Sequence, residues 1–379
     1  MTPLGHLRLL DLSRQLPGPF CSTLLADLGM DVLVVTAPND PFATGIPFLA
    51  RNKRSMTLNL KHDEGRAIFH RLARSADVVL EGFRPGVATR LGIDYPTLAA
   101  ENPRLIYCAI SGYGQDGPYR DRVGHDVNYL AQAGVLGYVG AAGGPPVIPG
   151  VQIADIGAGA LMAVVGILTA VIARERTGRG QMVDVAMLDG AVSWNVYHQL
   201  LRMLGGGVPP VRGMEQLTGG YACYNVYETR DGRWLTIGAY EPHFWTTLCR
   251  AVGREDLIPH QWAEGEQRAT ILACFRDIFR AAPLAEWEHR LGGLDICFAP
   301  VATLDEVAAD PQVRHRDMLP TMETALGPMR VPGVPIKLSD TPGSLRTPPP
   351  TLGADTDAVL RSIGLAADAI ARLRADGVV

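Results

Sequence analysis

The chain has 379 residues, of which 47% are hydrophobic and 20% are charged, and its formal net charge is −4. This composition is ordinary for a folded soluble protein, and the length favours two domains over a single core. Lys and Arg are scattered without a basic stripe or an aromatic-basic platform, which argues against nucleic-acid binding.

The cysteines lie far apart in the sequence and form no C-x-x-C pair. They are Cys21, Cys108, Cys223, Cys249, Cys274 and Cys297. Their spacing argues against a disulfide framework or a zinc site, and it predicts a reducing, cytoplasmic environment. The first residues contain no basic segment followed by an apolar run, so we expect no signal peptide.

The first third of the chain is predicted to alternate between strands and helices. Apolar runs over 7–12, 31–35, 77–80 and 105–110 have strand length, and helices are expected over 20–28, 63–74 and 87–91. This order predicts a parallel sheet with right-handed crossovers. The turn at Pro17-Gly18-Pro19 lacks the G-x-G-x-x-G pattern, so no dinucleotide is implied.

Basic residues occur near the loops of this predicted sheet. They are Arg51, Lys53, Arg54, Arg84 and Arg90. Ligands of open α/β sheets gather at the carboxyl ends of the strands, so these residues are candidates for phosphate binding. For any one of them taken alone, a solvated surface charge is the simpler interpretation.

The stretch from Gly124 to Gly180 holds the strongest candidates for chemistry. His125 lies one loop upstream of Asp155, which precedes an apolar helix expected over 156–176 and therefore stands at its N-cap position. The positive end of the helix dipole would face that carboxylate. His125 and Asp155 are thus a candidate acid/base pair, with simple helix capping as the alternative. The same apolar run is the only candidate for a membrane span, but its glycines and acidic start favour a core helix.

The second half of the chain is predicted to contain a strand over 181–187 and a helix over 188–204, followed by a Gly/Pro linker over 205–210. Segments 221–229 and 233–238 flank Arg230-Asp231-Gly232 and predict a hairpin. Helices are expected to about residue 290, then a strand over 297–301, an extended segment over 327–345 and a closing helix over 355–376. Pocket-lining candidates are Tyr129, Trp194, Tyr224 and Trp245.

Motifs along nearly the whole chain resemble, in a consistent order, the family III CoA-transferase superfamily (the carnitine-CoA transferase and bile-acid type). They lie at 10–13, 17–19, 25–29, 51–55, 59–61, 81–86, 111–115, 174–181 and 348–353. The resemblance implies an α/β fold with a large Rossmann-like, open parallel-sheet domain and a smaller α+β domain, in an interlocked homodimer. The large domain would span 1–204 and 326–379, and a linker at 205–220 would lead to the small domain at 221–325.

The resemblance also implies an enzyme that acts on acyl-CoA, with coenzyme A as part of the substrate and no permanently bound cofactor or metal. Arg84 and Arg90 match the family's CoA contacts, and Arg51, Arg54 and Tyr113 complete the expected CoA-binding residues. Family members often carry a charged residue after the second strand, but this chain has Val35-Thr36-Ala37 there, which puts nucleotide contacts at that place in doubt.

Two branches of the superfamily use the matching aspartate differently. In the transferase branch, the residue that matches Asp155 attacks the thioester and forms a mixed anhydride, then an aspartyl-CoA thioester. In the α-methylacyl-CoA racemase branch, the aspartate and the histidine of Gly-His-Asp exchange a proton on opposite faces of the α-carbon, through an enolate. His125 and Glu241, which stands where racemases place the partner of the histidine, favour the racemase branch. Asp126 is the alternative partner of His125.

Val151 stands where many racemases carry an asparagine, so one expected donor to the enolate oxygen is missing. The preferred interpretation is 1,1-proton transfer on an α-branched acyl-CoA thioester. CoA transfer between carboxylic acids through an Asp155 intermediate is the alternative. A catalytically silent acyl-CoA-binding protein is a third possibility, and the presence of His125, Asp155 and Glu241 argues against it, because binding alone needs none of them.

Overall fold

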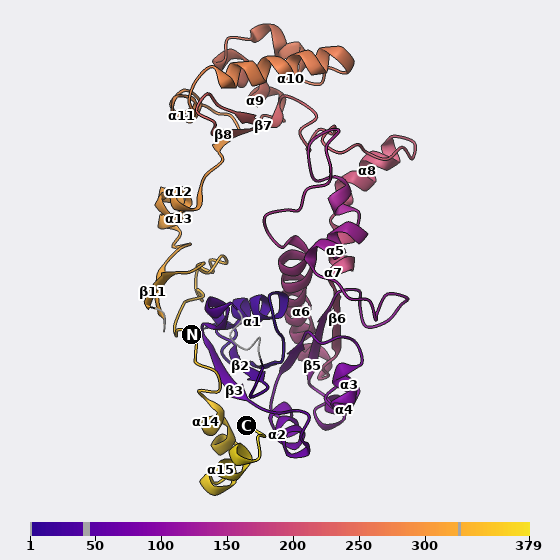
Figure 1. Ribbon diagram of the computed structural model, residues 1–379, viewed down its shortest axis with the longest axis vertical. Helices are drawn as coiled ribbons and strands as arrows, with labels where there is room; N and C mark the ends of the chain where they lie inside the picture. The colour runs from indigo at the N-terminus through magenta and orange to yellow at the C-terminus, as the bar shows by residue number, and fades with distance from the viewer. Residues whose placement is uncertain (1, 41–45, 325–326) are drawn as a thin grey trace. The chain divides into compact units, whose positions relative to one another are not determined.

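The computed structural model describes residues 2–40, 46–324 and 327–379, which form two compact units (Figure 1). The large unit comprises Met1–Ala133, Gly150–Trp194 and Pro311–Val379, and the small unit comprises Gly134–Pro149 and Asn195–Asp310. The domain boundaries expected from the sequence, at 204, 220 and 325, stay predictions, and the last of them lies outside the described residues.

A six-stranded parallel sheet forms the centre of the large unit. Its strands are β1 (Arg8–Asp11), β2 (Asp31–Thr36), β3 (Lys53–Thr57), β4 (Val78–Glu81), β5 (Ile106–Ser111) and β6 (Met182–Ala186). They follow the order β3-β2-β1-β4-β5-β6, which is the order of a doubly wound, Rossmann-like sheet. The predicted α/β class with a large, open parallel-sheet domain is therefore confirmed. Strand β3 was not expected, because its sequence, Lys-Arg-Ser-Met-Thr, has only one apolar side chain.

Helices α1 (Pro17–Asp27), α2 (Asp63–Ala73), α3 (Val87–Arg90) and α4 (Tyr95–Glu101) connect the strands. The core between helices and sheet includes Leu10, Leu33 and Val79, and residues near the C-terminus, such as Leu360 and Val378, belong to the same cluster. The two ends of the chain therefore share one hydrophobic core.

The C-terminal segment covers the edge of the sheet at β3. The backbone N–H of Ser55 donates to Asp355 Oδ2 at 2.8 Å, and that of Thr57 donates to Thr356 Oγ1 at 3.0 Å. These bonds satisfy amides that an edge strand would otherwise expose. The single closing helix expected here is wrong: α14 (Thr356–Ser362) and α15 (Ala367–Ala375) are separated at Gly364, whose φ of 85° an L side chain rarely adopts.

The central apolar helix begins as a π-helix, η3 (Ile153–Leu161), and continues as α6 (Met162–Thr177). The expected start at Ile156, with Asp155 as N-cap, is wrong: Gln152 occupies the N-cap position and Asp155 lies in the first turn. π-helical turns are rare and are frequently found at functional sites. The helix ends at Gly178 with φ 72°, at the glycine that the sequence indicated.

Helix α6 packs on β5 and β6 through one face that includes Ala163, Ile167 and Ala170 (Figure 1). Among the described residues, 153–177 is the one helix long and apolar enough to cross a membrane, with a mean hydropathy of 2.4. The contacts with the sheet assign one side of it to the core. Val165 and Ile172, on its other side, are exposed.

Close packing of η3 depends on glycine in the neighbouring helix α7 (Met187–Ser193). A Cβ atom at Gly190 would lie 2.7 Å from the Cβ and 2.8 Å from the backbone oxygen of Ala158. Helix α7 ends before α8 (Val196–Leu204), so the single helix expected over 188–204 is broken at Trp194 and Asn195.

The small unit has a three-stranded antiparallel sheet of β7 (Tyr224–Glu228), β8 (Trp234–Gly238) and β9 (Phe298–Pro300). The hairpin predicted from Arg230-Asp231-Gly232 is confirmed as β7 and β8. The core, with Tyr227, Leu235, Trp245, Phe275 and Phe279, is shared with α9 (Pro242–Ala251), α10 (Gly265–Arg280) and α11 (Leu284–Leu291).

The remaining elements are short. They are η1 (Pro47–Ala50), α5 (Asp126–Gln132), η2 (Val135–Gly137), η4 (Glu255–His260), α12 (Leu304–Ala309), α13 (Pro311–His315), β10 (Thr321–Thr324) and β11 (Gly327–Arg330). Strands β10 and β11 pair antiparallel. The segment expected to be extended from 327 therefore begins as a paired β-strand.

Replacing Gly190 by alanine should lower the free energy of unfolding by about 1–3 kcal/mol, because the new methyl group overlaps Ala158. The direction of this change in the free energy of unfolding is informative, since alanine in a helix ordinarily stabilises a protein by about 1 kcal/mol relative to glycine. Urea denaturation followed by circular dichroism measures the change. Gly150→Ala is the control, because a Cβ there meets no atom within 4 Å. Equal stability of Gly190→Ala and the wild type would contradict the packing described.

Candidate active site

A cavity of about 780 Å³ lies in the large unit at the carboxyl ends of β1, β4 and β5. Its wall is formed by Arg14, Gln15, Pro17 and Gly18 after β1, by 82–85 after β4, by 110–112 at the end of β5, by 120, 122–125, 128 and 129, and by Met187. Strands β1 and β4 are neighbours at the point where the strand order reverses, which is where doubly wound sheets bind ligands. The volume is in the range of small-molecule sites.

His125 lines this cavity and is exposed to solvent. It occupies the N-cap position of α5, and its backbone N–H donates to Asn128 Oδ1 at 3.0 Å. This bond fixes the backbone on which the imidazole is carried, at the wall of the cavity.

Tyr129 explains why two glycines surround this segment. Its buried ring lies so close to Gly112 and Gly124 that a Cβ at either position would be 2.5 or 2.8 Å from the ring. Its hydroxyl group donates to the backbone oxygen of Gly124. The glycines of Ser111-Gly112-Tyr113 and of Gly124-His125-Asp126 are therefore required by one aromatic ring between them.

Asp126 joins the His125 segment to the start of η3. The backbone N–H groups of Ala154 and Asp155 donate to Asp126 Oδ1 at 2.6 and 3.0 Å. The Asp126 carboxylate therefore lies at the first turn of η3, and within the described residues no hydrogen bond joins it to the His125 ring.

Asp155 is half-buried, and its pKa is raised to about 6. Burial is the largest cause, the charge of Asp126 raises it further, and His125 lowers it. His125 is therefore near enough for its charge to act on Asp155, although Asp155 itself is not part of the cavity wall. Asp155 also acts on Tyr129: burial first, and then this carboxylate, raise the pKa of the tyrosine to about 12. At neutral pH Asp155 is mostly ionised.

Glu241 belongs to the small unit, where it is exposed and occupies the N-cap position of α9 without capping it through its side chain. Its pairing with His125, which the family pattern implies, stays a prediction.

The expected CoA-binding arginines fall into two groups. Arg84 and Arg120 line the cavity. Arg90 lies close to Gly86: a Cβ atom added to this glycine would be 3.6 Å from Arg90 Nη1 and 3.7 Å from Arg120 Nη2. The guanidinium groups of Arg90 and Arg120 therefore both lie near Gly86. Tyr113 packs edge-on against Tyr129, with ring centroids 5.3 Å apart.

Arg51 and Arg54 form ion pairs inside the large unit instead of lining the cavity. Arg51 is 3% exposed and donates through Nε and Nη2 to the two carboxylate oxygens of Asp27. Arg54 pairs with Asp31, at the amino end of β2, at 2.8 Å. Whether either residue touches CoA stays a prediction.

Lys53 is also buried. Its Nζ donates to Ser22 Oγ at 2.7 Å and to the Pro19 oxygen at 3.0 Å, and it lies 3.7 Å from Asp11 Oδ2. Burial lowers the pKa of Lys53 to about 8. This ammonium group holds the start of α1, whose first residues line the cavity, and is therefore part of the support of the site.

Sequence reasoning missed Arg14, Arg120 and Arg122, which also line the cavity. The sequence feature that could have indicated two of them is the segment Tyr119-Arg120-Asp121-Arg122, which places two arginines shortly before Gly124-His125-Asp126. Arg122 lies over the Tyr119 ring, 3.6 Å from its centroid. In the parts of the chain that the structure describes, no group of three His, Cys, Asp or Glu side chains is placed to hold a metal ion.

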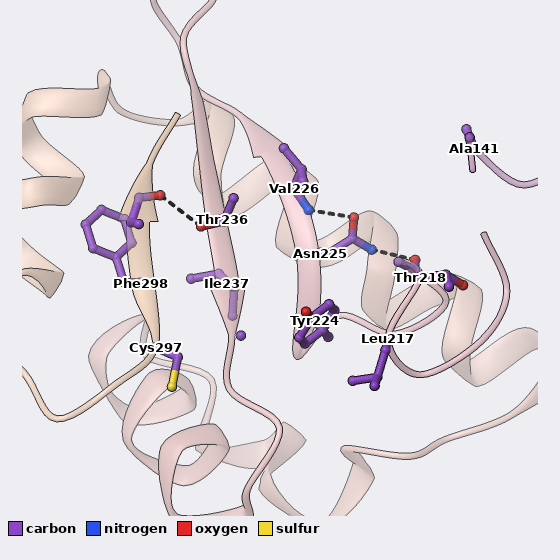
Figure 2. Close-up of a pocket in the computed structure, with 14 residues that line it drawn as sticks. Ala141, Leu217, Thr218, Tyr224, Asn225, Val226, Thr236, Ile237, Cys297 and Phe298 are labelled. Carbon is purple, nitrogen blue, oxygen red and sulfur yellow. Dashed lines mark hydrogen bonds between the residues drawn. The ribbon is translucent and has the colours of Figure 1, made fainter. Parts of the chain in front are cut away.

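A second cavity, of about 820 Å³, lies in the small unit (Figure 2). Tyr224 and Val226 on β7, Thr236 on β8 and Cys297 beside β9 line it, together with the loop 217–219. Figure 2 shows Asn225 between β7 and this loop, where its amide donates to the Gly219 oxygen at 2.7 Å. Of the pocket candidates, Tyr129 and Tyr224 line cavities, whereas Trp245 is buried in the core.

Comparison with known proteins places the chain among CoA-dependent proteins. The model of CoA-transferase family III matches residues 4–356. Alpha-methylacyl-CoA racemase of Mus musculus is 36% identical over 389 residues, which cover 99% of this chain and 97% of that protein. Succinyl-CoA:glutarate CoA-transferase of Homo sapiens is 30% identical over 397 residues, covering 100% and 90%. A crystal structure of a CaiB/BaiF family protein from Brucella suis is 29% identical and has a TM-score of 0.80, covering 96% of this chain and 99% of that one.

Proposed function

The chain belongs to CoA-transferase family III, and we propose that it catalyses 1,1-proton transfer at the α-carbon of an α-branched acyl-CoA thioester. The observation that carries this proposal is the position of His125 on the wall of the cavity at the switch point of the sheet, with Asp155 on the turn of η3 that is hydrogen-bonded to the neighbouring Asp126. A racemising enzyme needs two groups that can each hold or release a proton, and a transferase needs only the carboxylate. The 36% identity to a racemase supports the same choice.

In the proposed reaction, ionised Asp155 removes the α-proton, and the electron pair of the C–H bond moves into the enolate of the thioester. Protonated His125 then delivers a proton to the opposite face of the α-carbon. In the reverse direction the two residues exchange roles. A carboxyl pKa of about 6 suits this exchange, because general acid–base catalysis is most efficient when the pKa of the group lies near the working pH.

We propose further that the phosphates of CoA bind Arg84, Arg90 and Arg120. These side chains are exposed, and two of them line the cavity. Guanidinium groups bind phosphate oxygens through paired N–H donors. Arg51 and Arg54 are poorer candidates, because each is already paired with an aspartate.

CoA transfer between carboxylic acids is the second candidate function. The half-buried, ionised carboxylate of Asp155 would serve equally as a nucleophile toward a thioester. The identity of 30% to a succinyl-CoA:glutarate CoA-transferase supports this alternative, and Val151, in place of the asparagine of many racemases, is compatible with it.

We also propose that the chain forms a homodimer, as the family resemblance implies. Val165 and Ile172, which are 57% and 61% exposed, lie seven residues apart and so share one face of α6. In the small unit, Met203 and Leu204 of α8 are 71% and 73% exposed. Large exposed apolar patches mark association surfaces, and a second copy of the chain would cover them.

The wild-type protein should incorporate solvent deuterium at the α-carbon of 2-methylacyl-CoA without any acceptor acid. His125→Ala and Asp155→Asn should each lower the exchange rate by about a hundredfold or more, because each removes one proton-transfer group. Mass spectrometry of the recovered acyl-CoA measures the exchange. Movement of CoA to a free carboxylate with no α-exchange would reject the racemase proposal in favour of the transferase.

Arg84→Ala and Arg120→Ala should each weaken CoA binding by about tenfold, the loss expected for one hydrogen bond to a charged group. Titration calorimetry with CoA measures the dissociation constants. Arg54→Ala is the matched control, because Arg54 is an exposed arginine whose ion pair with Asp31 occupies it elsewhere. Weakening by Arg54→Ala as large as that by Arg84→Ala would contradict the assignment.

Light scattering after gel filtration should give about twice the chain mass of 40.7 kDa. The double variant with Val165→Glu and Ile172→Glu should shift the protein toward the monomer, because two charges would be buried in the contact. Ile336→Glu, at an exposed apolar residue outside α6, is the control. A wild-type monomer at micromolar concentration would overturn the dimer proposal.

A further inference from the structure

The two groups of the proposed reaction are connected through one carboxylate that the mechanism does not use. Asp126 follows His125 directly in the chain, and its Oδ1 accepts the backbone N–H of Asp155 at 3.0 Å and that of Ala154 at 2.6 Å. Asp126 is only 9% exposed, so these bonds are shielded from water. The spacing between imidazole and carboxylate therefore depends on one peptide linkage and two hydrogen bonds.

The first turn of η3 needs such an acceptor. The amides at the start of a helix have no partner inside the helix, and a side chain at the N-cap usually accepts from them. Gln152, at the N-cap position, makes no such side-chain bond. Asp126 supplies the acceptor from another helix, and its negative charge faces the positive end of the η3 dipole.

Resting on the proposed function, we infer that Asp126 is a positioning residue, which fixes the direction of the Asp155 carboxyl group relative to His125 and holds a negative charge beside it. Loss of the two bonds frees the turn that carries Asp155. A displacement of about 1 Å in a catalytic group is enough to cost about a hundredfold in rate.

The groups that surround Asp155 define the electrostatic consequence. Asp126 and His125 act on it from the start of α5, and Tyr129 lies one turn further along that helix. Among the other neighbours of η3, Pro17 of α1 and Met187 of α7 lie near Gly159, and Gly190 of α7 lies beside Ala158. After burial, Asp126 is the group that raises the pKa of Asp155.

The sign of the pH effect follows from this arrangement. A neighbouring negative charge disfavours the ionised form of Asp155, so neutralising Asp126 must lower the pKa of Asp155. Asp155 would then ionise at lower pH, and the acid limb of kcat for proton removal by Asp155 would move to lower pH.

Two substitutions separate position from charge. Asp126→Asn keeps an oxygen that can accept from both amides and removes the charge, whereas Asp126→Ala removes both. The titration of Asp155 is followed by ¹³C NMR on the full chain labelled at the aspartate γ-carbons, with the resonance assigned by its loss in Asp155→Asn. The proton-transfer rate is followed by deuterium exchange on 2-methylacyl-CoA, with kcat and KM determined across pH.

Asp126→Asn should move the Asp155 titration and the acid limb of kcat to lower pH, with KM unchanged. Asp126→Ala should lower kcat by about a hundredfold. Asp94→Asn is the control, because Asp94 also accepts a helix N-terminal amide, from Thr97 at 3.2 Å, but on α4 outside the cavity wall. Asp94→Asn should change neither the titration of Asp155 nor kcat.

An unchanged Asp155 titration in Asp126→Asn would overturn the electrostatic part of the inference, and wild-type kcat in folded Asp126→Ala would overturn the positioning part. If Asp126→Ala does not fold, the Asp155 titration in Asp126→Asn still decides the electrostatic part of the inference. A wild-type protein without α-exchange would reject the proposed function alone, because the NMR titration requires no turnover.

Discussion

Two hydrogen bonds to a single oxygen of Asp126 hold together segments that are 28 and 29 residues apart in the sequence. One segment carries His125 to the wall of the cavity, and the other opens the π-helix that carries Asp155. Helix α7 packs closely against η3 at Gly190, and α6, which continues η3, packs closely on β6 at Gly166, so the continuous helix has little freedom to move. The hydrogen bonds to Asp126 thus fix the start of η3, and close packing at Gly190 and Gly166 fixes the rest of the helix formed by η3 and α6.

The fold was largely predictable because its signals are local. Apolar runs of strand length, broken by glycine and proline, predicted five of the six strands in the parallel sheet, and the motifs predicted the family that the comparisons confirm. Strand β3 was not predicted, because it begins with two charged residues and contains only one apolar side chain. Lys53 lies in the interior only because Ser22 and the Pro19 oxygen accept from it there, and no pattern in the sequence shows a partner 31 or 34 residues away.

The site was predictable in part for the same reason. His125 and Asp155 were identified from their motifs, and the charge of His125 acts on Asp155, although the roles of the two residues stay predictions. Arg51 and Arg84 could not be told apart in the sequence, because an arginine that binds a phosphate and an arginine that neutralises a buried aspartate are the same residue type. Only the position of Asp27 separates them. The expected capping role of Asp155 was wrong, because the cap of η3 comes from a residue that is distant in sequence.

The shared core of the two chain ends has a consequence for biosynthesis. All residues of the small unit have been made once Asp310 has left the ribosome, whereas the large unit still lacks Leu360 and Val378, and the cover of β3. Nascent chains usually complete their N-terminal domain first. Here the order is reversed: the small unit can fold first, and the edge of the parallel sheet at β3 stays uncovered until Asp355 and Thr356 have been made. During that interval the unpaired edge at β3 could pair with another chain, and a chaperone that covers it would prevent this.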